Sequence, residues 1–104
     1  MNKEYLKTLV AEANKIDSQN EVAMEINRRK RLAEMTESLD DTISYLDICN
    51  ENELLWATEV LEDLMSQFKS KKLIDCIKRN MERCVDSEIK AQLNTTIEYM
   101  LKYL

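Results

Sequence analysis

Residues 51–68 read ENELLWATEVLEDLMSQF, and this stretch decides the fold class of the chain. Its apolar side chains recur every three or four residues, which places them along one side of an α-helix of about five turns. The positions on this side are Leu54, Ala57, Leu61, Leu64, Met65 and Phe68. We therefore predict a helix from Glu51 to Phe68 that organises the hydrophobic core.

The same helical spacing continues on both sides of this stretch. Short polar residues followed three positions later by an acidic residue are typical of helix starts. Such pairs are Ser18 with Glu21, Ser38 with Asp41, and Asn50 with Glu53. The predicted helices cover Asn2–Ile16, Gln19–Ser38, Leu39–Cys49, Glu51–Phe68, Ser70–Val85, and a last segment from Asp86 or Ser87 onward. The first two could also form one continuous helix.

Apolar patterning within these segments also predicts which residues face the core. In the second segment the inward residues are expected to be Val22, Ile26, Ala33 and Met35. In the last two segments, Leu73, Ile77 and Met81 recur at an offset of sixteen residues as Ile89, Leu93 and Ile97. This offset indicates two neighbouring helices of similar length, joined by a connection short enough to make them antiparallel.

Composition supports a helical fold throughout. The 104 residues include neither glycine nor proline. Tight hairpin turns and phosphate-binding loops rely on these residues, so their absence favours helices joined by short polar turns. The length is that of one domain. We predict a single all-α domain over residues 1–104, built as a compact bundle or as stacked hairpins of about five to six short helices.

The charges of the chain are unevenly distributed. The net charge is −5, but between Leu32 and Phe68 there are ten carboxylates and no lysine or arginine. They are Glu34, Glu37, Asp40, Asp41, Asp47, Glu51, Glu53, Glu59, Glu62 and Asp63. A negative block of this size attracts a basic protein and repels nucleic acid. We expect the middle of the chain to bind a positively charged partner.

Several kinds of chemistry lack the residues they need. Histidine is absent, which removes the usual Ser or Cys catalytic groupings and histidine-based metal sites. Without glycine there is no Walker loop and no dinucleotide-binding fingerprint. A carboxylate site for Mg²⁺ or Ca²⁺ could use only Glu37, Asp40 and Asp41, which are more simply explained as solvated. We expect no enzyme activity, no cofactor and no metal.

The cysteines and the apolar runs indicate the compartment. Cys49, Cys76 and Cys84 are an odd set without paired spacing, so we expect buried free thiols. No apolar run approaches the roughly 20 residues that span a membrane, and residues 1–10 lack the features of a secretory signal. A cytoplasmic protein without a membrane partner is therefore expected.

Helix geometry within residues 51–68 gives the candidate binding residues. At 100° per residue, Glu51, Glu59, Glu62 and Asp63 share one side of the helix, and Trp56 lies next to them. An aromatic residue among carboxylates is typical of an interface that steers and anchors a basic partner. Alternatively, Trp56 covers the edge of the core against a neighbouring helix. On the anchor interpretation, reversing Glu59, Glu62 and Asp63 to Lys would slow association while leaving the helices intact.

Basic residues flank the acidic block. Arg28, Arg29, Lys30 and Arg31 follow one another, so they point to different sides of a helix. Pairing with the acidic block, within the chain or between subunits, explains them better than a nucleic-acid groove, because the pI is about 4.8. Nucleic acid is therefore not an expected partner.

In general character, residues 50–104 resemble the small helical immunity proteins of bacterial polymorphic toxin systems. The stretches that carry the resemblance are NENELLWATEVLEDLMSQF, SKKLIDCIKRNMERC and DSEIKAQLNTTIEYMLKYL. The resemblance implies a cytoplasmic inhibitor without catalysis, whose acidic surface covers a basic active-site region of a toxin. No site residue can be carried over by position, so the candidates Glu51, Trp56, Glu59, Glu62 and Asp63 depend on helix geometry alone.

A structural or adaptor role is the alternative. The first forty residues have a narrow apolar stripe, which suits a partner helix better than a deep monomeric core. Such a protein would form homo-oligomers or dock on a larger assembly through its first helices.

Overall fold

A computed structural model describes all 104 residues, and six α-helices contain most of them. The helices are α1 (Lys3–Lys15), α2 (Glu21–Thr36), α3 (Leu39–Ile48), α4 (Glu51–Phe68), α5 (Lys71–Arg83) and α6 (Ser87–Met100), followed by a 3₁₀ turn over Leu101–Tyr103. No strand is present, so the prediction of an all-α fold with about five to six helices is confirmed.

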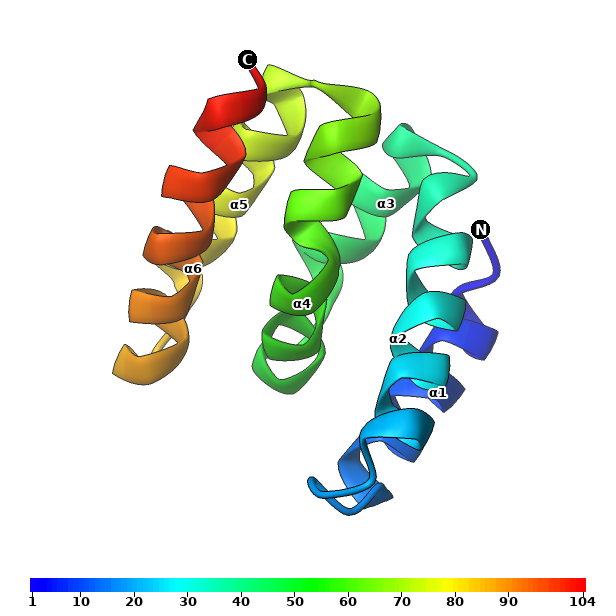
Figure 1. The fold of residues 1–104 in the computed structure, drawn as a ribbon. Helices are drawn as coiled ribbons and strands as arrows, with labels where there is room; N and C mark the ends of the chain where they lie inside the picture. The colour runs from blue at the N-terminus through cyan, green and yellow to red at the C-terminus, as the bar shows by residue number, and fades with distance from the viewer.

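The helices are arranged in two layers (Figure 1). Helices α2, α4 and α6 form one layer, and α1, α3 and α5 lie behind it. Each helix runs antiparallel to the next, so the chain forms three helical hairpins side by side. Within its layer α4 packs against both α2 and α6, and in the other layer α3 packs against α5. Helix α4 is therefore central, whereas α2 and α6 are the two edges of their layer.

A polar side chain caps the N-terminus of every α-helix. The residues that accept a hydrogen bond from a backbone N–H of the first turn are Asn2, Asn20, Ser38, Asn50, Ser70 and Asp86. The bounds of α4 are those predicted, and Ser38 and Asn50 cap as expected. The prediction that Ser18 caps the second helix is wrong. Asn20 does so by accepting from the Ala23 N–H at 3.2 Å, and α2 begins at Glu21.

The first two helices are separate. Ile16 has an extended backbone at φ −71° and ψ 133°, which ends α1, and α2 begins only at Glu21. The alternative of one continuous helix is therefore wrong. The turn between α4 and α5 contains Lys69 at φ 46°, a left-handed conformation that glycine usually supplies. This chain makes the turn without glycine.

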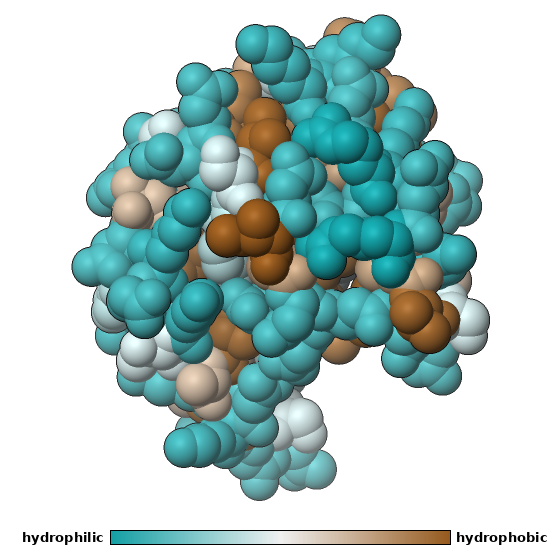
Figure 2. Space-filling view, turned by 180° about the vertical axis from the view of Figure 1, so that it is seen from behind, coloured by the Kyte–Doolittle hydropathy of each residue, from teal (hydrophilic) through white to brown (hydrophobic).

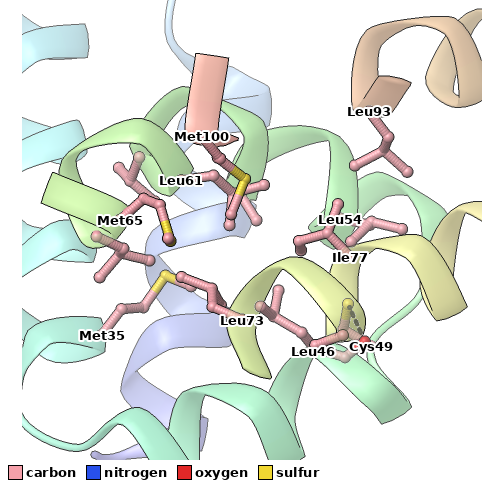
Figure 3. Packing of buried hydrophobic residues seen from close by; sticks show 14 of the residues in the cluster. Met35, Leu46, Cys49, Leu54, Leu61, Met65, Leu73, Ile77, Leu93 and Met100 are labelled. Atoms are coloured by element: carbon pink, nitrogen blue, oxygen red, sulfur yellow. Dashed lines mark hydrogen bonds between the residues drawn. The ribbon is translucent and has the colours of Figure 1, made fainter. Parts of the chain in front are cut away.

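A cluster of 20 buried hydrophobic residues forms the core. Side chains from all six helices meet in it, and Figure 3 shows among them Met35 from α2, Leu61 from α4 and Met100 from α6. On α4 the predicted inward residues Leu54, Ala57, Leu61, Leu64 and Met65 are all buried, and Phe68 is partly buried. Helix α4 therefore organises the core as predicted.

The inward side of α2 differs from the prediction. Val22 and Ile26 are 72% and 51% exposed, and Ala33 is exposed as well. Asn27 and Arg31 are buried instead, four residues apart on the side that also carries Met35. Polar side chains can occupy this side because each finds hydrogen-bond partners there. Met35 is buried as predicted, whereas Val22, Ile26 and Ala33 are left at the edge of the layer.

The rear face of the molecule is mostly hydrophilic, and its hydrophobic residues form separate groups rather than one broad area (Figure 2). None of the helices is both long enough and apolar enough to cross a membrane.

Candidate functional site

Helix α4 brings four of the five predicted binding residues to the outer side of its layer. Glu59 and Asp63 face α2, where they pair with Arg31 and Arg28 at 2.5 and 2.8 Å. Glu62 is exposed and accepts a hydrogen bond from the Tyr103 hydroxyl at 3.0 Å, which ties it to the C-terminal turn. Trp56 is partly exposed beside Glu59.

Glu51 lies apart from the other four. Its carboxylate accepts hydrogen bonds from the backbone N–H groups of Val85 and Asp86, at 2.7 and 3.0 Å. These two donors hold the pKa of Glu51 below its usual value. Glu51 thus fixes the turn between α5 and α6, a contact that helix periodicity cannot reveal.

Arg31 is among the largest side chains that the fold buries almost completely, with 2% of it exposed. Its guanidinium donates to the Asn27 side chain at 2.7 Å and to the Trp56 carbonyl at 2.8 Å, in addition to the pair with Glu59. Asn27 in turn donates to the Leu9 carbonyl at 2.8 Å. One polar network therefore joins α1, α2 and α4, and no buried side-chain donor or acceptor lacks a partner.

Trp56 is held from two sides. The Arg31 guanidinium carbon lies 5.2 Å from the centre of the Trp56 ring, within the range of a cation–π contact. The indole N–H donates to the Asn14 side chain at 2.8 Å, and Asn14 also exchanges hydrogen bonds with Asn52. Trp56 therefore covers the junction of α1, α2 and α4 while part of its ring stays at the surface.

A shallow hollow of about 120 Å³ lies beside this ring, between α4 and α6. It is lined by Leu55, Trp56, Thr58, Glu59 and Gln92. A partly exposed aromatic face next to an aliphatic residue and a carboxylate is suited to contact with a partner's side chain.

Replacing Trp56 by Phe should lower the free energy of unfolding by about 1 kcal/mol, because the ring over Arg31 is kept while the hydrogen bond to Asn14 is lost. Denaturant unfolding measures this loss. Replacing Asn14 by Ala should cause a loss of similar size, and the double variant should lose less than the sum of the two. Strictly additive losses would contradict the bond between these two side chains.

Most carboxylates of the acidic block are engaged within the molecule. Nine of the ten accept a hydrogen bond or form an ion pair, and the exception is Asp40. The predicted pairing of the basic run with this block is confirmed for Arg28 and Arg31. Arg29 pairs instead with Glu25, outside the block. The free negative charge of the block is thus smaller than its composition suggests.

This pairing changes how the acidic side of α4 can be tested. A Lys at position 59 would stand beside the buried guanidinium of Arg31, and a Lys at position 63 would face Arg28. Two like charges at these distances repel and would weaken the fold. We therefore expect that reversing Glu59, Glu62 and Asp63 together destabilises the fold, and Glu62 is the residue suited to a test of binding.

A second polar cluster joins α3 to α5. Asp47 pairs with Arg79 at 3.0 Å and accepts hydrogen bonds from Cys76 and Asn80. Burial opposes ionisation of Asp47, but these donors, Arg79 first, keep its pKa below the usual value. Arg83 donates to the carbonyls of Leu46 and Cys49 and so closes the end of α3. These contacts are structural, and no sequence pattern had indicated them.

All three cysteines are buried free thiols, as predicted. Burial raises the pKa of Cys49 to about 11. Burial and the neighbouring Asp47 carboxylate raise the pKa of Cys76 to about 12. Since the thiolate is the nucleophilic form, these two thiols are poor nucleophiles at neutral pH.

Two acidic residues near the start of α3 pair with the N-terminus of the chain. Glu37 and Asp41 contact the N-terminal ammonium of Met1 at 3.2 and 3.5 Å. No group of three or more Cys, Asp or Glu side chains is close enough to hold a metal ion.

Comparison of the chain with protein-family models, with curated proteins and with solved structures finds no match. The functional argument therefore depends on the residues themselves.

Proposed function

We propose that this protein is a non-catalytic binding module whose partner is a basic protein, and that it acts in the cytoplasm as an immunity-type inhibitor of a bacterial toxin. The outer side of α4 would cover a basic surface of the partner, with Trp56 and Leu55 in contact and Glu62 facing a positive group. Neither a cofactor nor a metal has a part in this function.

The observation that carries the proposal is that Trp56 is held in a fixed position beside the exposed carboxylate of Glu59. The ring is held by Arg31 and by Asn14, so little freedom is lost when a partner packs against it. Rigid aromatic residues of this kind dominate many protein interfaces, and the charges around them speed association.

Replacing Glu62 by Lys should slow association with the basic partner by roughly three- to tenfold at low salt, because a charge at the rim of an interface mainly sets the association rate. Affinity capture from a lysate of the source organism, with the wild type as bait, identifies the partner, and surface plasmon resonance then gives the rates. The difference should shrink as salt is raised.

Glu12→Lys is the matched control for this experiment. Glu12 is an exposed residue of α1 without an ion-pair partner, and its reversal changes the net charge by the same amount. Loss of the partner with Glu62→Lys alone supports the proposal. Equal effects of the two reversals, or capture of no basic protein by the wild type, would rule out the acidic side of α4 as the surface that binds the partner. For the inhibitor role, co-expression should relieve the toxicity of the captured partner.

A structural or adaptor role is the second candidate, because α2 exposes Val22 and Ile26 on the side away from α4. A protein in this role docks on a larger assembly or self-associates through its first helices. Light scattering on the captured material separates a one-to-one inhibitor complex from such an assembly.

A further inference from the structure

The outer side of α2 carries an apolar strip that no part of the chain covers. Val22 and Ile26 lie one turn apart and are 72% and 51% exposed, and Ala33 continues the strip two turns further on. Arg28 and Arg31, which reach α4, leave the helix on another side. Because α2 is the edge of its layer (Figure 1), a helix laid against this strip would extend the layer.

The strip lies in a shallow, open groove whose lining residues all belong to α2: Glu21, Val22, Glu25, Ile26 and Arg29. Its charges have a definite order along the helix. Glu25 lies in the first half, and Arg29 lies one turn later on the same flank. Glu25 bridges Arg28 and Arg29 at 3.0 Å each, and Arg28 also pairs with Asp63 of α4.

Because of this order, the charges along the groove of one copy of the chain can match those of a second copy. In an antiparallel pair of identical helices related by a two-fold axis, each residue meets residues on the same flank of its partner, in reversed order. Glu25 of one copy then meets Arg29 of the other, twice over, and Ile26 comes close to the axis. In a parallel pair this flank would face the opposite flank of the partner helix, so Glu25 and Arg29 would not meet each other.

We propose that two copies of this chain pair through α2, antiparallel, with Val22 and Ile26 buried between them and Glu25 facing Arg29 across the contact. This pairing deepens the second candidate function and uses a face separate from the acidic side of α4. The strip from Val22 to Ala33 is about 17 Å long at the rise of an α-helix. Two short helices that meet over this length bury less surface than the roughly 1,200 Å² at the lower end of standard interfaces. The dimer is therefore weak.

Sedimentation equilibrium tests the apolar part of the contact at protein concentrations up to about 1 mM, where weak pairing is populated. The wild type should show a monomer–dimer equilibrium, and Val22→Gln with Ile26→Gln should weaken it by at least roughly tenfold. Ile48→Gln is the matched control, because Ile48 has the same 72% exposure as Val22 but lies on α3. A monomeric wild type, or equal weakening by both changes, overturns the proposal.

Charge exchange tests the antiparallel geometry. Arg29→Glu places two carboxylates opposite each other at both ends of the contact and should weaken the dimer several-fold. The double variant Glu25→Arg with Arg29→Glu reverses the order of charge and should restore the dimer, since each Arg again meets a Glu. Failure of the double variant to restore pairing contradicts this arrangement. Either failure leaves the Glu62 prediction untouched, because Glu62 lies on α4 and faces the C-terminal turn.

Discussion

Replacing Arg31 by Ala should lower the free energy of unfolding by about 3 kcal/mol, one of the largest losses available outside the apolar core. The change removes an almost fully buried side chain and three hydrogen-bonded contacts. It also leaves the buried side-chain amide oxygen of Asn27 without its hydrogen-bond donor, which adds a desolvation cost. Denaturant unfolding followed by circular dichroism measures the loss.

Arg29→Ala is the matched control on the same helix. Arg29 also pairs with a glutamate, but its side chain is mostly exposed, so its removal should change stability little. Glu59→Gln should cost less than Arg31→Ala, because Glu59 is 38% exposed and water can replace part of the lost pair. Similar small losses for Arg31→Ala and Arg29→Ala would show that the buried network contributes no more than a surface ion pair.

The position of this network explains its importance. Arg31 links α2 to α4, and Asn27 extends the link to α1. Together they attach the first hairpin to the rest of the fold, while Arg31 also holds the ring of Trp56. Under the proposed function, loss of Arg31 should therefore weaken partner binding through Trp56 as well as stability.

Helix α4 could be predicted to the residue because every local signal agrees there. Its apolar positions keep one side over the whole length, and Asn50 supplies a cap before the first turn. The same agreement placed the start of α3, and the start of α6 was predicted to within one residue. Element boundaries are set locally, so sequence alone suffices where the cap and the apolar pattern coincide.

The orientation of α2 could not be predicted, because its buried side is polar. Periodicity assumes that apolar residues face inward, and this assumption points to Val22 and Ile26. The structure instead buries Asn27 and Arg31, whose hydrogen-bond partners lie on other helices. The sequence does contain a signal: Asn27, Arg31 and Met35 follow one another at intervals of four. This signal can be interpreted only when it is known that α4 places hydrogen-bond acceptors next to Arg31.

The acidic block shows the same limit of local information. Sequence locates each carboxylate, but its free charge depends on which cation the fold places beside it. Asp63 and Glu59 are neutralised from α2, and Glu51 binds backbone N–H groups of a distant turn. Of the five candidate binding residues, Glu62 keeps an exposed carboxylate with only a neutral partner.

Replacing Leu61 by Ala should lower the free energy of unfolding by about 3–5 kcal/mol, the largest single loss expected for this chain. Leu61 has no exposed surface and lies on the side of α4 that faces the core, where Figure 3 shows it near Met100 of α6. The side chains around it come from several helices, so they cannot all move to fill the space that the change creates.

Thermal and denaturant unfolding both report this loss, and Ile48→Ala is the control. Ile48 is a residue of similar size in a helix, but 72% of it is exposed, so its truncation removes little buried surface. A domain of this length has a total stability of about 5–15 kcal/mol, so Leu61→Ala should bring it close to the limit of folding. Equal effects of the two changes would mean that α4 does not organise the core. A much larger effect of Leu61→Ala would show that the stack of three hairpins depends on its central helix.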